Sequence, residues 1–389
     1  MTKKWSSRLT FFAFVVLMVG LGSNDSLRGI FSTIFQEHFS LTTTQLGLIV
    51  TASYIGNLVF LLVGGNLSTR FSKKRVLQVL ILIWMAALAL FAFTSNYTVL
   101  LIGMALALGS STLLNTTMNL ITPLLFATAP GFFVNFLFFT QEIGTSGSQY
   151  ILGSHADGFA FWQHTNLVLL ILGAVAFVLL LFCNVPEEAA DPADAPAQKG
   201  GYDWRIIVPY VLVFGFYFIA EHGVMNWMVA YGVDGLGLPQ ASAAKYLSVF
   251  FGGMMIGRLC LSPLVDKLGA LKSLAAFGGV SCVLYLIGSL GGAVTMPVWA
   301  ISGLSFSILY PTLVMSIRLY FPAQQVSGAA GTILSIASLA DILFNVGFGK
   351  LVDMTGYAVS IRVLPLSALA FFIVFMLFTK FCKPTQKLK

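Results

Sequence analysis

Twelve long apolar stretches constrain what this chain can fold into more than any other feature. A helix needs about 20 apolar residues to cross a hydrocarbon layer ~30 Å thick. With that window the stretches run over residues 9–34, 44–66, 76–94, 98–121, 132–153, 164–183, 205–231, 241–262, 271–290, 294–318, 325–349 and 358–381. Because a backbone in lipid must satisfy its hydrogen bonds within its own segment, each stretch is predicted to be a transmembrane helix. The expected fold class is an all-α membrane protein with twelve transmembrane helices.

The composition excludes most other classes of protein. Only 9% of the residues are charged and 58% are hydrophobic, whereas soluble proteins are roughly 25% charged. A soluble enzyme, a disulfide scaffold, a disordered chain and a nucleic-acid binder are therefore excluded. The four cysteines lie within or at the ends of apolar runs, without metal-ligand spacing. We expect the lipid bilayer as a partner, and neither a metal nor a cofactor.

The basic residues predict the orientation of the chain. If the N-terminus is cytoplasmic, 17 of the 21 Lys and Arg residues lie on the inner side, and the outer half keeps Arg28, Lys245, Lys350 and Arg362. This is the pattern of a positive-inside protein, and it explains the net charge of +7 without nucleic acid. We expect a multi-pass protein of the cell (inner) membrane with both termini cytoplasmic.

One long polar stretch divides the chain into two parts of similar length. Residues Pro186–Asp203 read PEEAADPADAPAQKGGYD, and this mixture of Ala, Pro, Gly and acids cannot bury a core. We interpret residues 184–204 as a flexible cytoplasmic linker. It separates an N-terminal six-helix bundle, residues 1–183, from a C-terminal six-helix bundle, residues 205–389.

A short internal repeat indicates how each half is built. A small residue followed four positions later by an acid or its substitute occurs in four expected loops: Gly65–Thr69, Gly153–Asp157, Ser262–Asp266 and Gly349–Asp353. Their starts are 88 and 87 residues apart within the halves, and 197 and 196 apart between them. Because three helices reverse the direction of the chain, each half is predicted to consist of two inverted three-helix repeats.

Ionisable side chains inside the spans are costly to bury, so each is a functional candidate. In the first span, Asp25 and Arg28 are three residues apart and share one helix face. The other acids are Glu142 in the fifth span, Glu221 in the seventh and Asp341 in the eleventh. Spans 1 and 7, and spans 5 and 11, are equivalent in the two halves, as a central cavity between the halves would require. These five residues are candidates for proton coupling.

A structural role is the alternative for each of these residues. Asp25 and Arg28 could form a permanent ion pair that only holds the first span in place. For coupling, the pair has to separate during the cycle so that the carboxylate can take up a proton. Glu221 could be a hydrogen-bond acceptor, and Asp341 could pair helices. His222, next to Glu221, is more simply interpreted as a packed neutral histidine.

Amide and aromatic side chains within the spans are candidates for binding a solute. Asn115 and Asn119 lie one turn apart on the fourth span, where amides can bind hydroxyls or hold neighbouring helices together at about 0.6 kcal/mol. The other candidates are polar, or aromatic with a polar edge: Asn24, Tyr54, Gln141, Glu221, Asn226, Trp227, Tyr310 and Asn345. Near the cytoplasmic helix ends, Arg70, Arg258 and Asp266 are candidates for an inner gate.

Several stretches of the chain resemble one known family. Gly65–Lys74, GNLSTRFSKK, resembles the loop signature between helices 2 and 3 of the major facilitator superfamily, and Leu264–Gly269, LVDKLG, is its second-half copy. Within that superfamily, the chain resembles the fucose/glucose–galactose permease group of sugar:proton symporters. The likeness covers nearly the whole chain, and the stretches that carry it are Asn24-Asp25, Ala220–Trp227, Phe251–Arg258 and Gly303–Thr312.

The resemblance implies a secondary active transporter and not an enzyme. It implies proton-coupled symport of a sugar or a similar small polar solute by alternating access, for which a monomer suffices. The Asp of the Asn-Asp pair is thought to carry the coupling proton in that group, so Asp25 is the first candidate here. Asn115 stands where the fucose permease pattern has Glu, so an amide replaces a carboxylate thought to take part in sugar binding or proton passage.

The alternative function is that of a proton-driven exporter of a small metabolite or drug. The fifth span lacks the Gly-x-x-x-Gly-Pro run typical of antiporters in this superfamily and reads Thr145-Ser146-Gly147-Ser148 instead. A membrane sensor would need a sizeable soluble output domain, and the longest polar stretch is Pro186–Asp203. A membrane-embedded enzyme is not indicated, because the sequence has no phosphate-binding loop, zinc-ligand spacing or nucleophile elbow.

Overall fold

The chain divides into two compact units, Met1–Ala190 and Asp191–Lys389. The structure, a computed structural model, describes residues 3–126, 130–183, 185 and 202–384, and within them the side chains of all but residues 3–6, 63–70, 130–132, 135, 266, 323, 324 and 327. Every regular element in the described ranges is a helix. The expected linker, Pro186–Asp203, lies outside the described residues except for its last two positions.

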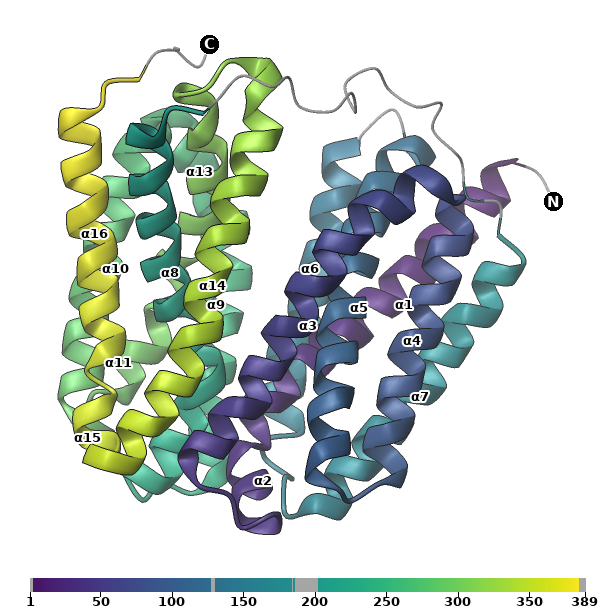
Figure 1. The fold of residues 1–389 in the computed structure, drawn as a ribbon, viewed down its shortest axis with the longest axis horizontal. Coiled ribbons are helices and arrows are strands. Elements are labelled where there is room, and N and C mark those ends of the chain that lie inside the picture. The colour runs from purple at the N-terminus through teal and green to yellow at the C-terminus, as the bar shows by residue number, and fades with distance from the viewer. Residues whose placement is uncertain (1–2, 127–129, 184, 186–201, 385–389) are drawn as a thin grey trace. The chain divides into compact units, whose positions relative to one another are not determined.

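The N-terminal unit contains seven helices in its described part. They are α1 (Lys3–Ile30), α2 (Ser32–His38), α3 (Thr43–Arg70), α4 (Lys73–Phe93), α5 (Tyr97–Leu125), α6 (Pro130–Ile151) and α7 (Phe159–Leu181). α1 packs against α5, α6 and α7, α3 packs against α5, and α4 packs against α5 and α7 (Figure 1). Two of these helices begin at polar caps, since Ser72 accepts a hydrogen bond from the backbone N–H of Arg75, and Asn96 accepts from those of Thr98 and Val99.

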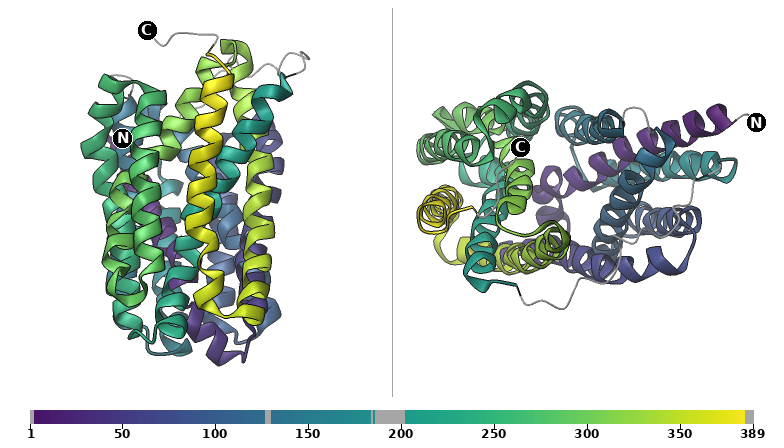
Figure 2. Two further views of the ribbon diagram at one scale, coloured as in Figure 1. Left: turned by 90° about the vertical axis from the view of Figure 1, so that its left-hand side faces the viewer. Right: turned by 90° about the horizontal axis from the view of Figure 1, so that it is seen from above.

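The C-terminal unit is built of longer and shorter helical pieces. They are α8 (Trp204–Ala230), the π-helical turn η2 (Tyr231–Gly235), α9 (Gln240–Leu268), α10 (Ala270–Leu290), η3 (Gly292–Val294), α11 (Met296–Ile301), α12 (Gly303–Phe306), α13 (Leu309–Ser316), η4 (Ile317–Leu319), α14 (Ala323–Thr355), α15 (Tyr357–Ser360) and α16 (Val363–Phe381). α8 lies between α14 and α16 and packs against both, and α16, yellow, also lies along α10 (Figure 2).

All twelve expected spans coincide with helical segments. Among the described residues, eleven helical stretches are long and apolar enough to cross a membrane. α6, which corresponds to the expected span 132–153, is not among these eleven candidates. The expected span 294–318 is one candidate stretch, Met296–Leu319, but it is interrupted into α11, α12, α13 and η4. The chain is therefore an all-helical, multi-pass membrane protein.

The four copies of the repeated motif, a small residue followed four positions later by an acid or its substitute, do not all lie in loops, contrary to the expectation. Only Gly153–Asp157 follows a helix end, whereas Gly65–Thr69, Ser262–Asp266 and Gly349–Asp353 lie within the last turns of α3, α9 and α14. The reason is visible at α9 and α14, which continue until Gly269 and Gly356. These glycines have φ of +80° and +76°, a conformation that ends a helix and that side-chain-bearing residues rarely adopt.

Small residues allow α1 and α6 to approach closely. A Cβ at Gly22 of α1 would collide with the carbonyl oxygen of Gln141, and a Cβ at Gly144 of α6 with that of Val19. Hydroxyls complete the contact, because the Ser26 and Ser148 hydroxyls are 2.7 Å apart. This packing holds the polar part of α1, residues 24–28, in a defined position within the N-terminal unit.

Candidate functional site

The carboxylate of Asp25 is held inside the N-terminal unit. Its Oδ2 accepts a hydrogen bond of 3.2 Å from the hydroxyl of Ser111 on α5, a residue that is 1% exposed. Its Oδ1 is buried and has no hydrogen-bond partner. Arg28, one turn further along α1, interacts with Asp25 electrostatically. Asp25 as a residue is half-buried, and a carboxylate with one unpartnered oxygen can accept a proton or a solute hydroxyl there.

Arg28 itself is only 5% exposed. Its guanidinium carbon lies 5.7 Å from the ring centre of Tyr54 on α3, in a cation–π arrangement. Its Nε is buried without a hydrogen-bond partner. The structure thus brings together three sequence-predicted residues: Asp25, Arg28 and Tyr54.

A chain of amides links α5 to α6. Asn119 donates from Nδ2 to Oδ1 of Asn115 at 2.6 Å, and Asn115 donates from Nδ2 to Oε1 of Gln141 at 2.6 Å. Oδ1 of Asn119 remains buried without a partner. The one-turn spacing of Asn115 and Asn119 was readable from the sequence, but the bond to Gln141 shows that the pair also joins two helices. Glu142, the next residue of α6, is half-buried.

Asn24 points to a different neighbour from Asp25. Its Oδ1 accepts a 3.1 Å hydrogen bond from the indole Nε1 of Trp84 on α4, and both side chains are buried. Asn24 therefore has a structural partner that its sequence position did not indicate.

Gln149 on α6 is fully buried, and neither of its amide atoms has a hydrogen-bond partner among the described residues.

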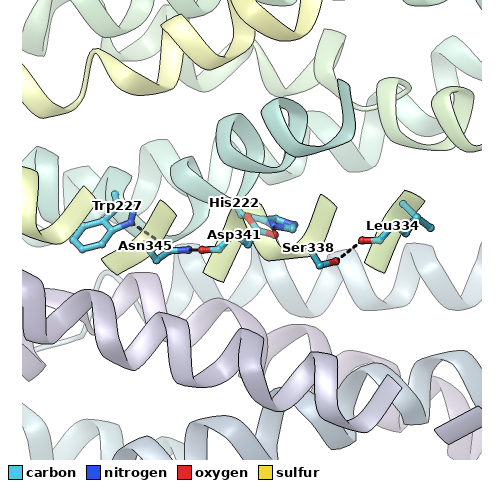
Figure 3. A network of polar contacts seen from close by, with 6 residues as sticks. All are labelled: His222, Trp227, Leu334, Ser338, Asp341 and Asn345. Atoms are coloured by element: carbon cyan, nitrogen blue, oxygen red, sulfur yellow. Dashed lines mark hydrogen bonds and ion pairs between the residues drawn. The ribbon is translucent and has the colours of Figure 1, made fainter. Parts of the chain in front are cut away.

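In the C-terminal unit, Asp341 pairs with a histidine (Figure 3). Its Oδ2 lies 2.7 Å from Nδ1 of His222, where side-chain exposures are 3% for the aspartate and 26% for the histidine. The His222 ring also stacks on Phe218, with 5.3 Å between ring centres. Oδ1 of Asp341 is buried without a partner. The basic partner of Asp341 thus comes from α8 and not from its own helix.

The same network continues one turn along α14. Asn345, which is fully buried, accepts a 2.9 Å hydrogen bond at Oδ1 from Nε1 of Trp227, and its Nδ2 donates to the backbone oxygen of Asp341. Figure 3 shows these residues in line between α8 and α14. Asn226, beside Trp227, is 2% exposed. Trp227 and Asn345 are therefore packed partners of each other.

Glu221 interacts electrostatically with three tyrosines of the C-terminal unit, of which Tyr217 and Tyr285 are fully buried. Its charge acts on Tyr217, Tyr285 and Tyr310, and the positive charge of Arg258 acts on Tyr217 and Tyr310. Arg258 was expected at an inner gate, and its charge reaches two of the tyrosines that the charge of Glu221 also reaches. The other two gate candidates cannot be placed in this way, since the side chains of Arg70 and Asp266 lie outside the described residues.

Sequence reasoning missed several of these residues. Ser111 precedes Asn115 and Asn119 by one and two turns, so the polar face of α5 carried a signal that could have found it. Trp84 carried no such signal, because its partner Asn24 lies 60 residues away in the sequence. Within the described residues, no group of His, Cys, Asp and Glu side chains has the geometry of a metal site.

We expect Asp341→Ala to destabilise the C-terminal unit by about 1–3 kcal/mol, the cost of removing one partner of a buried, charge-assisted hydrogen bond. Asp341→Asn keeps a hydrogen-bond acceptor and should lose less stability than Asp341→Ala. Ser338→Ala is the matched control on the same helix, because among the described residues the Ser338 hydroxyl bonds to the Leu334 carbonyl of its own helix and to no other helix. Thermal unfolding of the purified protein measures all three. Equal stability of wild type and Asp341→Ala would show that the pair contributes nothing.

Comparison with known proteins places this arrangement in a class. The sequence profile of the Major Facilitator Superfamily matches residues 10–344. The chain is 24% identical to the L-fucose-proton symporter of Escherichia coli K12 over 333 residues, which cover 74% of this chain and 75% of that one. It is 26% identical to the hexuronate transporter of Bacillus subtilis 168 over 365 residues, 85% of this chain and 84% of the other.

A solved structure shows the same fold. The crystal structure of FucP, a major facilitator transporter in the outward conformation, superposes with a TM-score of 0.66 over 97% of this chain and 99% of that chain, at 20% identity. The helical architecture is therefore shared with that structure. The chain belongs to the Major Facilitator Superfamily, a family of transporters and not of enzymes. The expected resemblance to this superfamily is confirmed.

Proposed function

We propose that the protein is a proton-coupled symporter of a sugar or a similar small polar solute. It works by alternating access between two six-helix halves, each made of two inverted three-helix repeats. The halves correspond to residues 1–183 and 205–389, joined by the cytoplasmic linker 184–204. The protein acts as a monomer in the cell (inner) membrane, with both termini in the cytoplasm.

The observation that carries this proposal is the state of Asp25. Oδ2 of this carboxylate is bonded to Ser111, whereas its buried Oδ1 has no partner. Burying an ionisable side chain inside the membrane costs free energy, so such a residue is expected to have a function. The simplest function for a carboxylate with a free oxygen is to take up and release a proton. Glu142, Glu221 and Asp341 are further candidates for the proton path.

Solute contacts are proposed from both units, and in each case the support is an amide or carboxylate inside a span. In the N-terminal unit the amide chain Asn119–Asn115–Gln141 offers the unpartnered Oδ1 of Asn119 to a hydroxyl. Asn24, Tyr54, Glu221, Asn226, Trp227, Tyr310 and Asn345 are the other proposed contacts, and Arg70, Arg258 and Asp266 are the proposed gate. Asn24, Trp227 and Asn345 already have partners, so their direct contact with solute requires a rearrangement.

The relatives support the solute class. One is named a fucose–proton symporter and another a hexuronate transporter, and both names specify sugars or sugar acids. The amide at Asn115 removes one acid from the fourth span relative to the fucose permease pattern. With this acid replaced by an amide, Asp25 is the main residue proposed to take up and release the proton, and the solute is proposed as a class and not as fucose itself.

Transport in proteoliposomes tests the proposal against export. With acid outside and neutral buffer inside, a symporter should accumulate labelled sugar or sugar acid, and a protonophore should abolish accumulation. With the proton gradient reversed, the same vesicles should lose solute. A solute that moves outward while protons move inward would establish the exporter instead.

A further inference from the structure

Arg28 presents the least satisfied polar group of the site. A guanidinium carries five N–H donors, and that of Arg28 forms no hydrogen bond to any side chain or carbonyl among the described residues. Its contacts there are the face of Tyr54 and the electrostatic interaction with Asp25. The residue as a whole is 5% exposed. One of these donor atoms, Nε, is buried, and a buried charged donor without an acceptor is costly, so an acceptor for the guanidinium is expected at some stage of the cycle.

Asp25 does not supply that acceptor. Its Oδ2 accepts from Ser111, its Oδ1 has no partner, and no ion pair joins it to Arg28 within the described residues. The two opposite charges balance each other at a distance, without closing into a salt bridge. Both Arg28 and Asp25 therefore keep open positions for a ligand, a donor position on one and an acceptor position on the other.

We propose that Arg28 binds the carboxylate of a sugar acid of the hexuronate class. This inference rests on the symport proposed above and specifies its solute. The planar fork of an arginine matches a carboxylate with two parallel hydrogen bonds. The ring of Tyr54 lies 5.7 Å from the guanidinium carbon and contributes a cation–π contact, which uses none of the N–H donors in a hydrogen bond. The ring hydroxyls of the solute would then be bound by the amide chain of α5 and α6.

The charge balance explains how proton and solute are coupled. Without solute, Asp25 and Arg28 together are neutral. A bound carboxylate would add one negative charge to a buried site, which is costly unless a proton neutralises Asp25 at the same time. The net charge of the site is then zero both without solute and with solute and proton bound, and one proton enters with each monovalent sugar acid. Transport of the sugar acid is therefore electroneutral.

A sugar phosphate would not fit this balance, because its second negative charge needs a second cation. The remaining titratable groups on the helices packed against α1 are Glu37 and His38 on α2, Tyr97 on α5, Glu142 and Tyr150 on α6, and His164 on α7. Tyr54 on α3 faces Arg28 as an uncharged ring. Among the described residues, Arg28 is the charged group that acts on Asp25.

Three probes that differ only at carbon 6 test the proposal: D-glucose, D-glucuronate and D-glucose 6-phosphate. Each is offered to proteoliposomes of the full chain with acid outside. Glucuronate should accumulate, and a potassium diffusion potential set with valinomycin should leave its rate unchanged. Arg28→Gln should reduce glucuronate uptake by about tenfold to a hundredfold, the effect of losing hydrogen bonds to a charged group.

Two variants control for misfolding and for a nonspecific loss of charge. Arg28→Lys keeps the positive charge but loses the planar pair of donors, so its rate of glucuronate uptake should lie between those of wild type and Arg28→Gln. Arg205→Gln removes an exposed arginine and should behave as wild type. The increase in melting temperature that glucuronate causes in purified wild-type protein should be absent in Arg28→Gln, whose own melting temperature reports its folding.

The outcomes separate this inference from the proposed symport. Proton-driven accumulation of glucose in preference to glucuronate overturns the inference and leaves symport intact. Uptake of glucuronate that depends on Arg28 but not on a proton gradient overturns symport and leaves the carboxylate site intact. Preference for glucose 6-phosphate, undiminished glucuronate uptake by Arg28→Gln, or no response to any of the three probes overturns the inference.

Discussion

Asp25→Asn should abolish proton-driven accumulation of solute while exchange of solute across the membrane continues. The amide keeps the size of the side chain and can still accept the hydrogen bond from Ser111, so the local fold should survive. It cannot take up or release a proton, so the proton gradient no longer acts on the solute. Counterflow and pH-driven uptake in the same proteoliposomes measure the two activities separately, and we expect a loss of accumulation to the level of empty vesicles.

The matched control for this prediction is Glu37→Gln, which removes an exposed acid on α2. It should accumulate solute as wild type does. Ser111→Ala should give an intermediate result, because it removes one hydrogen bond to the carboxylate and leaves its charge. Full accumulation by Asp25→Asn would remove Asp25 from the coupling mechanism and direct attention to Glu142, Glu221 and Asp341.

Gly144→Val should disrupt the N-terminal unit. Even one Cβ at this position collides with the carbonyl oxygen of Val19, and it also lies 3.0 Å from the backbone nitrogen of Ser23. Both obstacles are backbone atoms of α1, so α1 and α6 have to move apart. Overpacking of this kind typically costs about 1–3 kcal/mol, and separation of the helices also removes the Ser26–Ser148 contact. We expect a fall in melting temperature and, with the position of α1 lost, little transport.

Gly147→Ala on the same helix is the control, because a Cβ there has nothing within 4 Å. Alanine is favoured over glycine in a helix interior by about 1 kcal/mol in water, so this variant should be at least as stable as wild type. Comparison of the two melting curves isolates the close approach from the general effect of replacing glycine. Equal melting temperatures for Gly144→Val and Gly147→Ala would contradict the close packing of α1 and α6.

Much of the fold was predictable, and the errors have identifiable causes. Apolar length located the helical segments, because burial in hydrocarbon requires it over every span. The interruption of Met296–Leu319 into α11, α12, α13 and η4 was not predicted, since hydropathy is insensitive to local backbone geometry. Three copies of the repeated motif were wrongly placed in loops, because α3, α9 and α14 are longer than their apolar parts.

The candidate site was predictable as a set of residues but not as a set of contacts. The cost of charge in a membrane marked Asp25, Arg28 and Asp341 without any structure. That Asp341 meets His222, and that Arg28 meets Tyr54, depends on how separate helices pack.

The amino-acid sequence alone determined that this chain spans a membrane many times, that it divides near its middle, and where polar groups enter the spans. These properties follow from local hydropathy and charge, which each segment carries by itself. Only the tertiary structure decided which polar groups are satisfied, because a hydrogen bond between helices depends on distances of a few tenths of an ångström. For the same reason, the sequence could not show that Nε of Arg28 is buried without a hydrogen-bond partner among the described residues.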